Sequence, residues 1–232
     1  MVRVTGKEHV GGTGYQVTKH SLNAPMNVLF IGNSFTGRNN VPGLIARLAE
    51  SRGHQLKHRL ISSGGASLRM HWNKGDAQQA IRQTRYDYVV LQEQSTLPIK
   101  NPVRMHENIR LFDKEIKDSG AKTALYLTWA RQNAPETQKA ITDAYVAIGE
   151  ELGAAIVPVG VAWQNLIRKH SLPVLHDQDQ SHPTLAGSYL AACVFFAVLF
   201  DENPSGIAGD IKGLTKKEIE LLQKTAWATV QK

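Results

Sequence analysis

The feature that most constrains this chain is the regular alternation of short apolar runs with longer helical patterns. Five runs have the length and composition of buried strands. In chain order they are Asn27–Ile31, Gln55–Ile61, Tyr86–Leu91, Thr123–Thr128 and Ala155–Val159. Strands that alternate with helices run parallel, because each helical connection crosses back over the sheet. We therefore predict an α/β fold with a five-stranded parallel sheet and helices on both of its faces.

The intervening helices are predicted from apolar residues at helical spacing. Their approximate bounds are Pro42–Arg52, Asp76–Thr84, Val103–Ser119, Pro135–Leu152, Val161–His170, Leu185–Phe200 and Thr215–Val230. No internal repeat and no linker rich in proline or serine interrupts the pattern, so we expect a single domain over residues 26–232. The first 25 residues are polar and rich in glycine, and we expect them to form an extension outside that domain.

The composition excludes several classes of protein. Of the 232 residues, 42% are hydrophobic and 20% are charged, which is typical of a globular protein and excludes wholesale disorder. The single cysteine, Cys193, excludes an internal disulfide and a zinc site built on several thiolates. We expect Cys193 to be a small buried side chain in its apolar helix.

The net charge of +7 does not by itself indicate a nucleic-acid partner, because the basic residues are scattered along the chain. We expect no nucleic-acid partner. No apolar run approaches the roughly 18 residues of a membrane-spanning helix, and the first 25 residues lack the apolar stretch of a signal peptide. We therefore expect a cytoplasmic protein without a membrane partner.

Functional residues are expected where the strands end, because ligands of open parallel sheets bind beyond the carboxyl ends of the strands. The segments that follow the first four strands are Gly32–Asn40, Ser62–Leu68, Gln92–Pro98 and Trp129–Asn133. A fifth segment, His176–Thr184, precedes a helix and is too rich in ionisable groups for a plain connection.

Ser34 stands directly after the first strand, in the sequence Gly-Asn-Ser-Phe-Thr. A serine at this position either caps the following helix or acts as a nucleophile at the mouth of the sheet. The pair Asp179 and His182 favours the nucleophile. The two residues are three positions apart, so the carboxylate can hydrogen-bond the imidazole and leave its other nitrogen free to take the serine proton. Ser34, Asp179 and His182 are the candidate catalytic residues.

Two further segments offer hydrogen-bond donors to a developing oxyanion. The glycines of Ser62-Ser-Gly-Gly65 can bring a backbone N–H close to a substrate, although a simple tight turn explains them equally well. Gln92 and Gln94 carry side-chain amides directly after the third strand, where helix capping is the alternative explanation.

These segments, in this order, resemble the SGNH (GDSL-like) hydrolase superfamily over nearly the whole of residues 27–200. Gly-Asn-Ser34-Phe-Thr is similar to its first block, Gly64-Gly65 to its second, and Asp179-x-x-His182-Pro to its last. The resemblance implies a three-layer, flavodoxin-like α/β/α sandwich and no cofactor. It further implies a serine esterase for small acyl esters, an acetylated carbohydrate among the candidates, in which Ser34 attacks, His182 transfers the proton and Asp179 orients His182.

The third block departs from the family pattern. Leu91-Gln-Glu-Gln-Ser95 stands where Gly-x-Asn-Asp is common, whereas sialate O-acetylesterase-like members carry Gln-Gly-Glu-Ser-Asn. By that similarity we expect Gln92 to join the backbone N–H groups of Ser34 and Gly65 in the oxyanion hole. Gln94 and Gly64 are the reserve candidates.

The segments around Leu-Gln-Glu-Gln-Ser, Trp129-Ala-Arg131 and His182-Pro-Thr-Leu are most similar to a little-characterised bacterial branch of the superfamily. Trp129 and Arg131 follow the fourth strand, and we expect them to line the substrate pocket.

Three alternatives remain open at this stage. Gly32–Asn39 nearly spells a phosphate-binding loop, but an arginine replaces its lysine and an asparagine its hydroxyl residue. The segment His176–His182 carries two histidines and two aspartates that can ligate a metal and activate a water, which would leave Ser34 without a function. The last alternative is a ligand-binding module without catalysis.

Overall fold

A five-stranded parallel sheet forms the centre of the computed structural model, which describes residues 24–207 and 211–231. The strands are β1 (Met26–Gly32), β2 (Leu56–Ser62), β3 (Tyr88–Leu91), β4 (Lys122–Tyr126) and β5 (Ala155–Val157). Their order across the sheet is β2-β1-β3-β4-β5, and every pair is parallel. The predicted sheet is confirmed. The expected N-terminal extension, residues 1–25, lies almost wholly outside the described residues.

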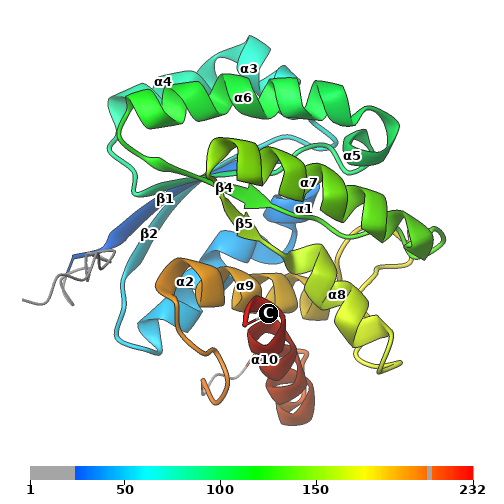
Figure 1. Ribbon diagram of the computed structural model, residues 1–232. Helices are drawn as coiled ribbons and strands as arrows, with labels where there is room; N and C mark the ends of the chain where they lie inside the picture. Colours follow the sequence, from blue (N-terminus) through cyan, green and yellow to red (C-terminus); the bar gives the residue numbers. More distant parts are fainter. Residues whose placement is uncertain (1–23, 208–210, 232) are drawn as a thin grey trace, which may run out of the picture.

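Helices cover both faces of the sheet, as Figure 1 shows. One layer contains α3 (Leu68–Lys74), α4 (Asp76–Gln83), α6 (Pro102–Asp118) and α7 (Gln138–Leu152), and the other α2 (Val41–Glu50), α8 (Val159–Ile167), α9 (Leu185–Phe200) and α10 (Lys216–Val230). Alternate residues of each strand serve the two layers. In β1, Leu29 and Ile31 pack in the first core, and Val28 and Phe30 pack in the second. The three-layer α/β/α sandwich is confirmed.

Helix α9 is apolar around its whole circumference because it lies inside the second layer. It packs against α2, α8 and α10 as well as the sheet. Cys193 sits on α9 with a fully buried thiol, and burial raises its pKa. The expectation of a small buried side chain is confirmed. Within the described residues, no helix has the length and apolar character needed to cross a bilayer.

Short helices that the periodicity does not predict follow three of the strands. They are α1 (Ser34–Gly37), η1 (Arg38–Asn40), α3 (Leu68–Lys74) and α5 (Leu97–Lys100). Helices of three to seven residues are too short to show a periodic pattern of apolar residues. A further short helix, η2 (Pro135–Thr137), precedes α7. The fifth strand ends at Val157, two residues earlier than predicted, because Pro158 has no N–H to donate and begins α8.

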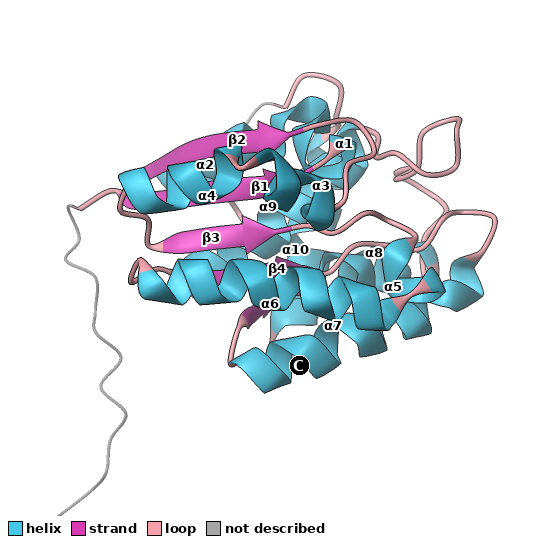
Figure 2. Cartoon of the chain, turned by 90° about the horizontal axis from the view of Figure 1, so that it is seen from above, coloured by secondary structure: helices cyan, strands magenta, loops and turns pink. Residues whose placement is uncertain are grey.

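The connections of β1 determine where a ligand can bind. The chain passes from β1 to β2 on one side of it and then returns across β1 to β3 on its other side. Such a reversal opens a crevice at the carboxyl end of the sheet. Figure 2 shows the strands pointing to one edge of the molecule, where α1, α3 and several loops gather. Ser34 follows β1 directly and therefore lies at this edge.

Candidate active site

Ser34 is the first residue of α1, and Asn33 shapes the turn that presents it. The Asn33 side chain accepts a hydrogen bond from the backbone N–H of Phe35 at 3.1 Å and donates one to the carbonyl of Ala66 at 3.0 Å. The first bond caps α1, and the second joins the serine turn to the segment that follows β2. Asn33, and not Ser34, is therefore the N-cap of α1, so the helix-capping alternative for Ser34 is wrong.

The structure brings Ser34, His182 and Asp179 together in one hydrogen-bonded line. Ser34 Oγ lies 2.8 Å from His182 Nε2, and His182 Nδ1 is bonded to Asp179 Oδ2. The other carboxylate oxygen, Oδ1, accepts the backbone N–H groups of His182 at 2.8 Å and Ser181 at 3.0 Å. The backbone bond from His182, followed by the imidazole bond, holds the pKa of Asp179 well below its usual range. The carboxylate is therefore ionised wherever the protein is folded near neutral pH.

Asp179 and His182 belong to a tight hairpin-like loop. His176 and Pro183 pair in an antiparallel bridge, and the N–H of Asp177 donates to the carbonyl of His182 at 2.8 Å. Gln180, at the turn, has a positive φ of 60°. This loop, residues 176–183, carries both Asp179 and His182, and we call it the triad loop.

The triad loop is tied to two neighbouring segments. The indole N–H of Trp129 donates to the carbonyl of Ser181 at 3.0 Å, which joins the loop to the segment after β4. Arg38 forms an ion pair with Asp177 at 2.7 Å, which joins it to the segment after α1. Arg38 occupies the position of the lysine in the phosphate-loop alternative, and this pairing gives it a role within the protein.

A series of stacked aromatic rings packs against His182. The ring of Phe35 meets the imidazole edge-on at 5.6 Å and stacks on Trp129 at 4.5 Å. Trp129 in turn stacks on Trp163 at 3.9 Å. Because Phe35 and Trp163 cover both faces of Trp129, that indole supports its neighbours and offers a ligand only its edge. Arg131, two residues on, is exposed.

Gly64 and Gly65 form an exposed turn after β2, in which Gly65 has a positive φ of 66°. The N–H groups of Ser34, Gly64 and Gly65 have no hydrogen-bond acceptor among the described residues. These backbone groups are therefore available to donate to a substrate oxygen.

Gln92, the expected oxyanion donor, is buried and hydrogen-bonded within the protein on both sides of its amide. It is fully buried, and its Nε2 donates to the carbonyl of Glu93 at 2.6 Å. Its Oε1 accepts the N–H of Asn33 at 2.9 Å and the hydroxyl of Thr36 at 3.1 Å. The side chain braces the turn that carries Ser34. Gly32 is required beside it, since a Cβ there would lie 2.6 Å from Gln92 Oε1.

Gln94, the reserve candidate, caps a turn. Its Oε1 accepts the N–H groups of Thr96 at 2.9 Å and Leu97 at 3.1 Å. The capping alternative noted for this segment therefore describes Gln94 Oε1, whereas its Nε2 has no acceptor among the described residues.

Glu93 is a central residue that the sequence patterns did not single out. It is fully buried, and its Oε1 accepts the N–H groups of Leu68 at 2.9 Å and Gln94 at 2.7 Å. Its Oε2 accepts Nδ2 of Asn108 on α6 at 2.8 Å. Burial outweighs these bonds and raises the pKa of Glu93. A carboxylate directly after an apolar strand was the available signal, because a buried charge needs several partners.

His71 is another buried polar side chain beside the Ser34 turn. Its Nε2 donates to the carbonyl of Gly32 at 2.7 Å, and burial lowers the pKa of this imidazole. Two buried side chains thereby hold the backbone just before Ser34, His71 at the carbonyl of Gly32 and Gln92 at the N–H of Asn33.

The metal alternative requires a cluster of ligands, and residues 24–207 and 211–231 contain none. No group of three or more His, Cys, Asp or Glu side chains in that part of the chain is placed to hold an ion. His176 donates from Nε2 to the carbonyl of Ala130 at 2.9 Å and packs edge-on against Trp163 at 4.8 Å. His176 and His182 thus have separate partners.

Solved structures of known proteins are similar to this fold, whereas comparisons by sequence find no match. No family model and no curated protein matches the sequence. A solved structure of a proposed SGNH hydrolase from Slackia heliotrinireducens is similar to 76% of this chain and 100% of its own, with 26% identity and a TM-score of 0.68. A DUF4886 family protein from Bacteroides uniformis is similar over 90% of this chain and 95% of its own, with 20% identity and a TM-score of 0.75. The acetylxylan esterase Axe2 from Geobacillus stearothermophilus is 17% identical over 75% of this chain and 94% of its own, with a TM-score of 0.61. The last two similarities concern the fold alone.

Proposed function

We propose that this member of the SGNH hydrolase superfamily is a serine esterase that hydrolyses small acyl esters. Membership follows from the fold and from the similarity to the Slackia protein. One observation carries the proposed activity. Ser34, His182 and Asp179 form a continuous hydrogen-bonded line at the carboxyl end of the sheet.

The hydrogen bonds assign a role to each member of that line. Ionised Asp179 accepts a hydrogen bond from the Nδ1–H of His182, so the lone pair of Nε2 faces the Ser34 hydroxyl. His182 takes the serine proton as Oγ attacks the ester carbonyl, and it returns that proton to the departing alcohol. The acyl group stays on Ser34. A water then repeats the sequence, losing a proton to His182 and releasing the acid and the free serine.

The negative oxygen of each tetrahedral intermediate needs hydrogen-bond donors. We assign this task to the backbone N–H groups of Ser34 and Gly65, with Gly64 as the neighbouring candidate, because they have no other acceptor among the described residues. Gln92 is left out because its amide is engaged with the backbone of Glu93.

The test is ester hydrolysis by a Ser34→Ala variant. With p-nitrophenyl acetate, kcat is expected to fall by about 10⁴ or more, because the nucleophile is gone. A fluorophosphonate probe should label the wild type and not the variant. Ser51→Ala is the matched control, since Ser51 is an exposed serine at the end of α2. Undiminished turnover by folded Ser34→Ala would overturn the proposal.

Chelation separates this mechanism from metal-assisted hydrolysis. Exhaustive treatment with EDTA is expected to leave turnover of p-nitrophenyl acetate unchanged, because the proposed nucleophile is a serine hydroxyl and not a metal-bound water. Loss of activity that zinc or manganese restores would point instead to a metal site in the chain.

A further inference from the structure

Trp129 contacts the triad loop at the peptide group that leads into His182. Its indole is buried, with 2% of its surface exposed, and its N–H donates to the carbonyl of Ser181 at 3.0 Å. The N–H of the same peptide group, that of His182, donates to Oδ1 of Asp179 at 2.8 Å. Because a peptide group is planar and rigid, two bonds at its opposite ends fix the orientation of the plane that precedes the imidazole.

Trp129 is itself held by the core. The ring of Phe35 stacks on one of its faces at 4.5 Å and the ring of Trp163 on the other at 3.9 Å, with interplanar angles of 6° and 5°. The ring of Tyr126 packs against it edge-on at 6.3 Å. Packing on both faces leaves the indole one orientation, so the core and not the triad loop sets the position of its N–H.

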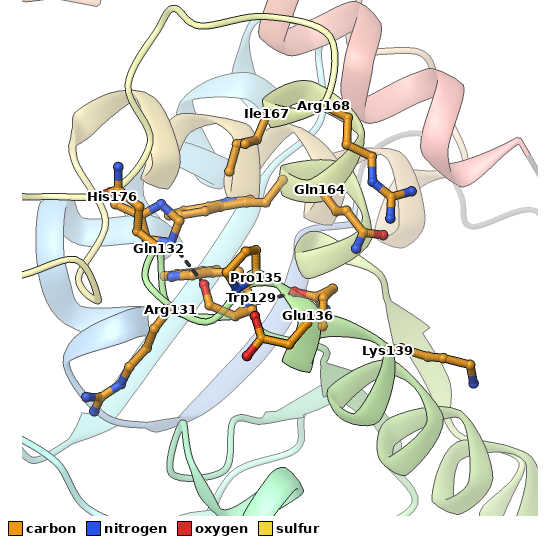
Figure 3. Close-up of a pocket in the computed structure, with 13 residues that line it drawn as sticks. Trp129, Arg131, Gln132, Pro135, Glu136, Lys139, Gln164, Ile167, Arg168 and His176 are labelled. Atoms are coloured by element: carbon orange, nitrogen blue, oxygen red, sulfur yellow. Dashed lines mark hydrogen bonds between the residues drawn. The ribbon is translucent and has the colours of Figure 1, made fainter.

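The segment that follows β4 holds the same loop at two more points. The N–H of Gln132 donates to the carbonyl of Gln180 at 2.9 Å, and Nε2 of His176 donates to the carbonyl of Ala130 at 2.9 Å (Figure 3). Neither bond involves a peptide group next to His182. The indole bond is therefore the one of the three that acts directly on the proton-transfer residue.

Trp163 provides the comparison. It is buried like Trp129 and stacks on it, and both rings line a cavity of about 320 Å³ that His176 also lines (Figure 3). The N–H of Trp163 is buried and has no acceptor among the described residues. The two tryptophans are thus alike in packing, and they differ in the bond to the triad loop.

The proposed mechanism gives His182 two tasks that depend on its position. It takes the proton of the Ser34 hydroxyl, whose Oγ lies 2.8 Å from Nε2, and it returns that proton to the departing alcohol. The second task matters only for some leaving groups. An alkoxide is a strong base and must be protonated as it leaves, whereas p-nitrophenolate is a weak base and departs without a proton.

We propose that Trp129 is a positioning residue for His182: through the carbonyl of Ser181, its indole N–H holds the imidazole where it can return the proton to the departing alcohol. The inference rests on the proposed esterase function and adds to it the residue that sets this step. In the step, the bond between the carbonyl carbon and the alcohol oxygen breaks while the proton on Nε2 passes to that oxygen. Trp129 acts on it through the triad loop alone.

The test removes the N–H and compares two leaving groups. Trp129→Phe keeps an aromatic ring between Phe35 and Trp163 but has no donor. Wild type and variant are assayed with ethyl acetate and with p-nitrophenyl acetate, which form the same acetyl-enzyme and differ in the group that leaves. The comparison uses kcat/KM, because it covers the steps up to that acetyl-enzyme. The ratio of kcat/KM for ethyl acetate to kcat/KM for p-nitrophenyl acetate is expected to fall about tenfold in the variant.

Trp163→Phe is the matched control, because it removes the same atoms from the same stack but no bond to the triad loop. The space that it leaves joins the same cavity, so the losses of packing at the two positions are comparable. Its ratio should equal that of the wild type. An unchanged ratio in Trp129→Phe, or an equal fall in both variants, would overturn the inference while leaving the esterase proposal intact.

A second replacement keeps the test decisive if Trp129→Phe does not fold. The amino acid β-(3-benzothienyl)alanine has the shape of tryptophan with sulfur in place of the N–H, so its incorporation at position 129 removes the donor alone. The same fall in the ratio is expected, and a wild-type ratio would contradict the inference. The esterase proposal is judged separately, since it fails if the wild-type protein hydrolyses neither ester and does not react with the fluorophosphonate probe.

Discussion

The two halves of the proposed active site are held by different kinds of contact. On the nucleophile side, Asn33, Thr36 and Gln92 are buried and bonded to one another behind Ser34. On the proton-transfer side, the side chains of Asp179 and His182 are 46% and 28% exposed on the triad loop. Bonds of the first kind do not compete with water, whereas bonds of the second kind do. Mutations in the buried half should therefore act mainly on stability, and mutations in the exposed half mainly on turnover.

Among the variants that test this comparison, the largest effect is expected from Asp179→Asn. The amide still accepts the backbone N–H groups of Ser181 and His182, but its NH₂ group faces His182 Nδ1 and favours the wrong tautomer. By analogy with triads in general, kcat should fall by about 10³–10⁴. The melting temperature should change by no more than a few degrees. A large loss of stability with normal kcat would break the distinction between the two halves.

Gln92→Ala is expected to show the opposite pattern. It leaves the N–H of Asn33 and the hydroxyl of Thr36 unpaired and opens a cavity, at a cost of about 3 kcal/mol in the free energy of unfolding. For a chain of this size, that corresponds to roughly 6–12 °C in melting temperature. Thermal denaturation and kcat should be measured on the same preparation. A kcat loss of about 10²–10³ at unchanged melting temperature would restore the oxyanion role for Gln92.

Gln94→Ala serves as the control for that measurement. It removes the cap of a turn and not a fully buried side chain, so the free energy of unfolding is expected to fall by about 1 kcal/mol. A melting temperature that falls as far as in Gln92→Ala would show that the two amides are energetically alike.

Glu93→Gln tests the buried hydrogen bonds of Glu93 through the pH dependence of stability. The new NH₂ group faces Nδ2 of Asn108, which costs about 1–3 kcal/mol. Burial raises the pKa of Glu93 in the folded state, so the contribution of this carboxyl to stability is complete below about pH 4.5 and is lost as the pH rises through the folded pKa. The advantage of the wild type over the variant should therefore be greatest near pH 4 and smaller at pH 7. Denaturant unfolding at both pH values measures it, and an advantage that grows with pH would contradict the assignment.

The smallest effect is expected from Arg38→Ala. This residue pairs with Asp177 between two exposed side chains, and such pairs contribute about 0–1 kcal/mol. The melting temperature should shift by less than about 3 °C, and 0.5 M salt should reduce the difference between wild type and variant. A larger shift would show that the triad loop depends on this one ion pair.

The sequence predicted the fold because periodicity and composition are local properties. Each strand was located to within a few residues, since an apolar run bounded by polar residues has one stable place, between two layers of helices. The candidate residues were found for a related reason. Polar side chains directly after buried strands must gather at one edge of a parallel sheet, so Ser34 could be placed there without coordinates.

The role of Gln92 could not be obtained in the same way. Its side chain can donate in two directions and accept in two others, and the chain itself does not say which groups it will meet. The groups that donate to its Oε1 come from Asn33 and Thr36, which follow a different strand. The same holds for Glu93, whose bonds reach α3 and α6.

By itself, the sequence determined the parallel α/β sheet, the edge at which the candidate residues lie and the residue types able to carry the proposed chemistry. Only the tertiary structure decided which polar groups are already bonded and which remain free, which separates Gln92 from the N–H groups of Ser34 and Gly65. It also decided that Trp129 is covered on both faces and that a cavity opens beside it. The physical reason is that strand and helix formation follow the local order of residues, whereas hydrogen-bond satisfaction and packing depend on groups brought together from distant parts of the chain.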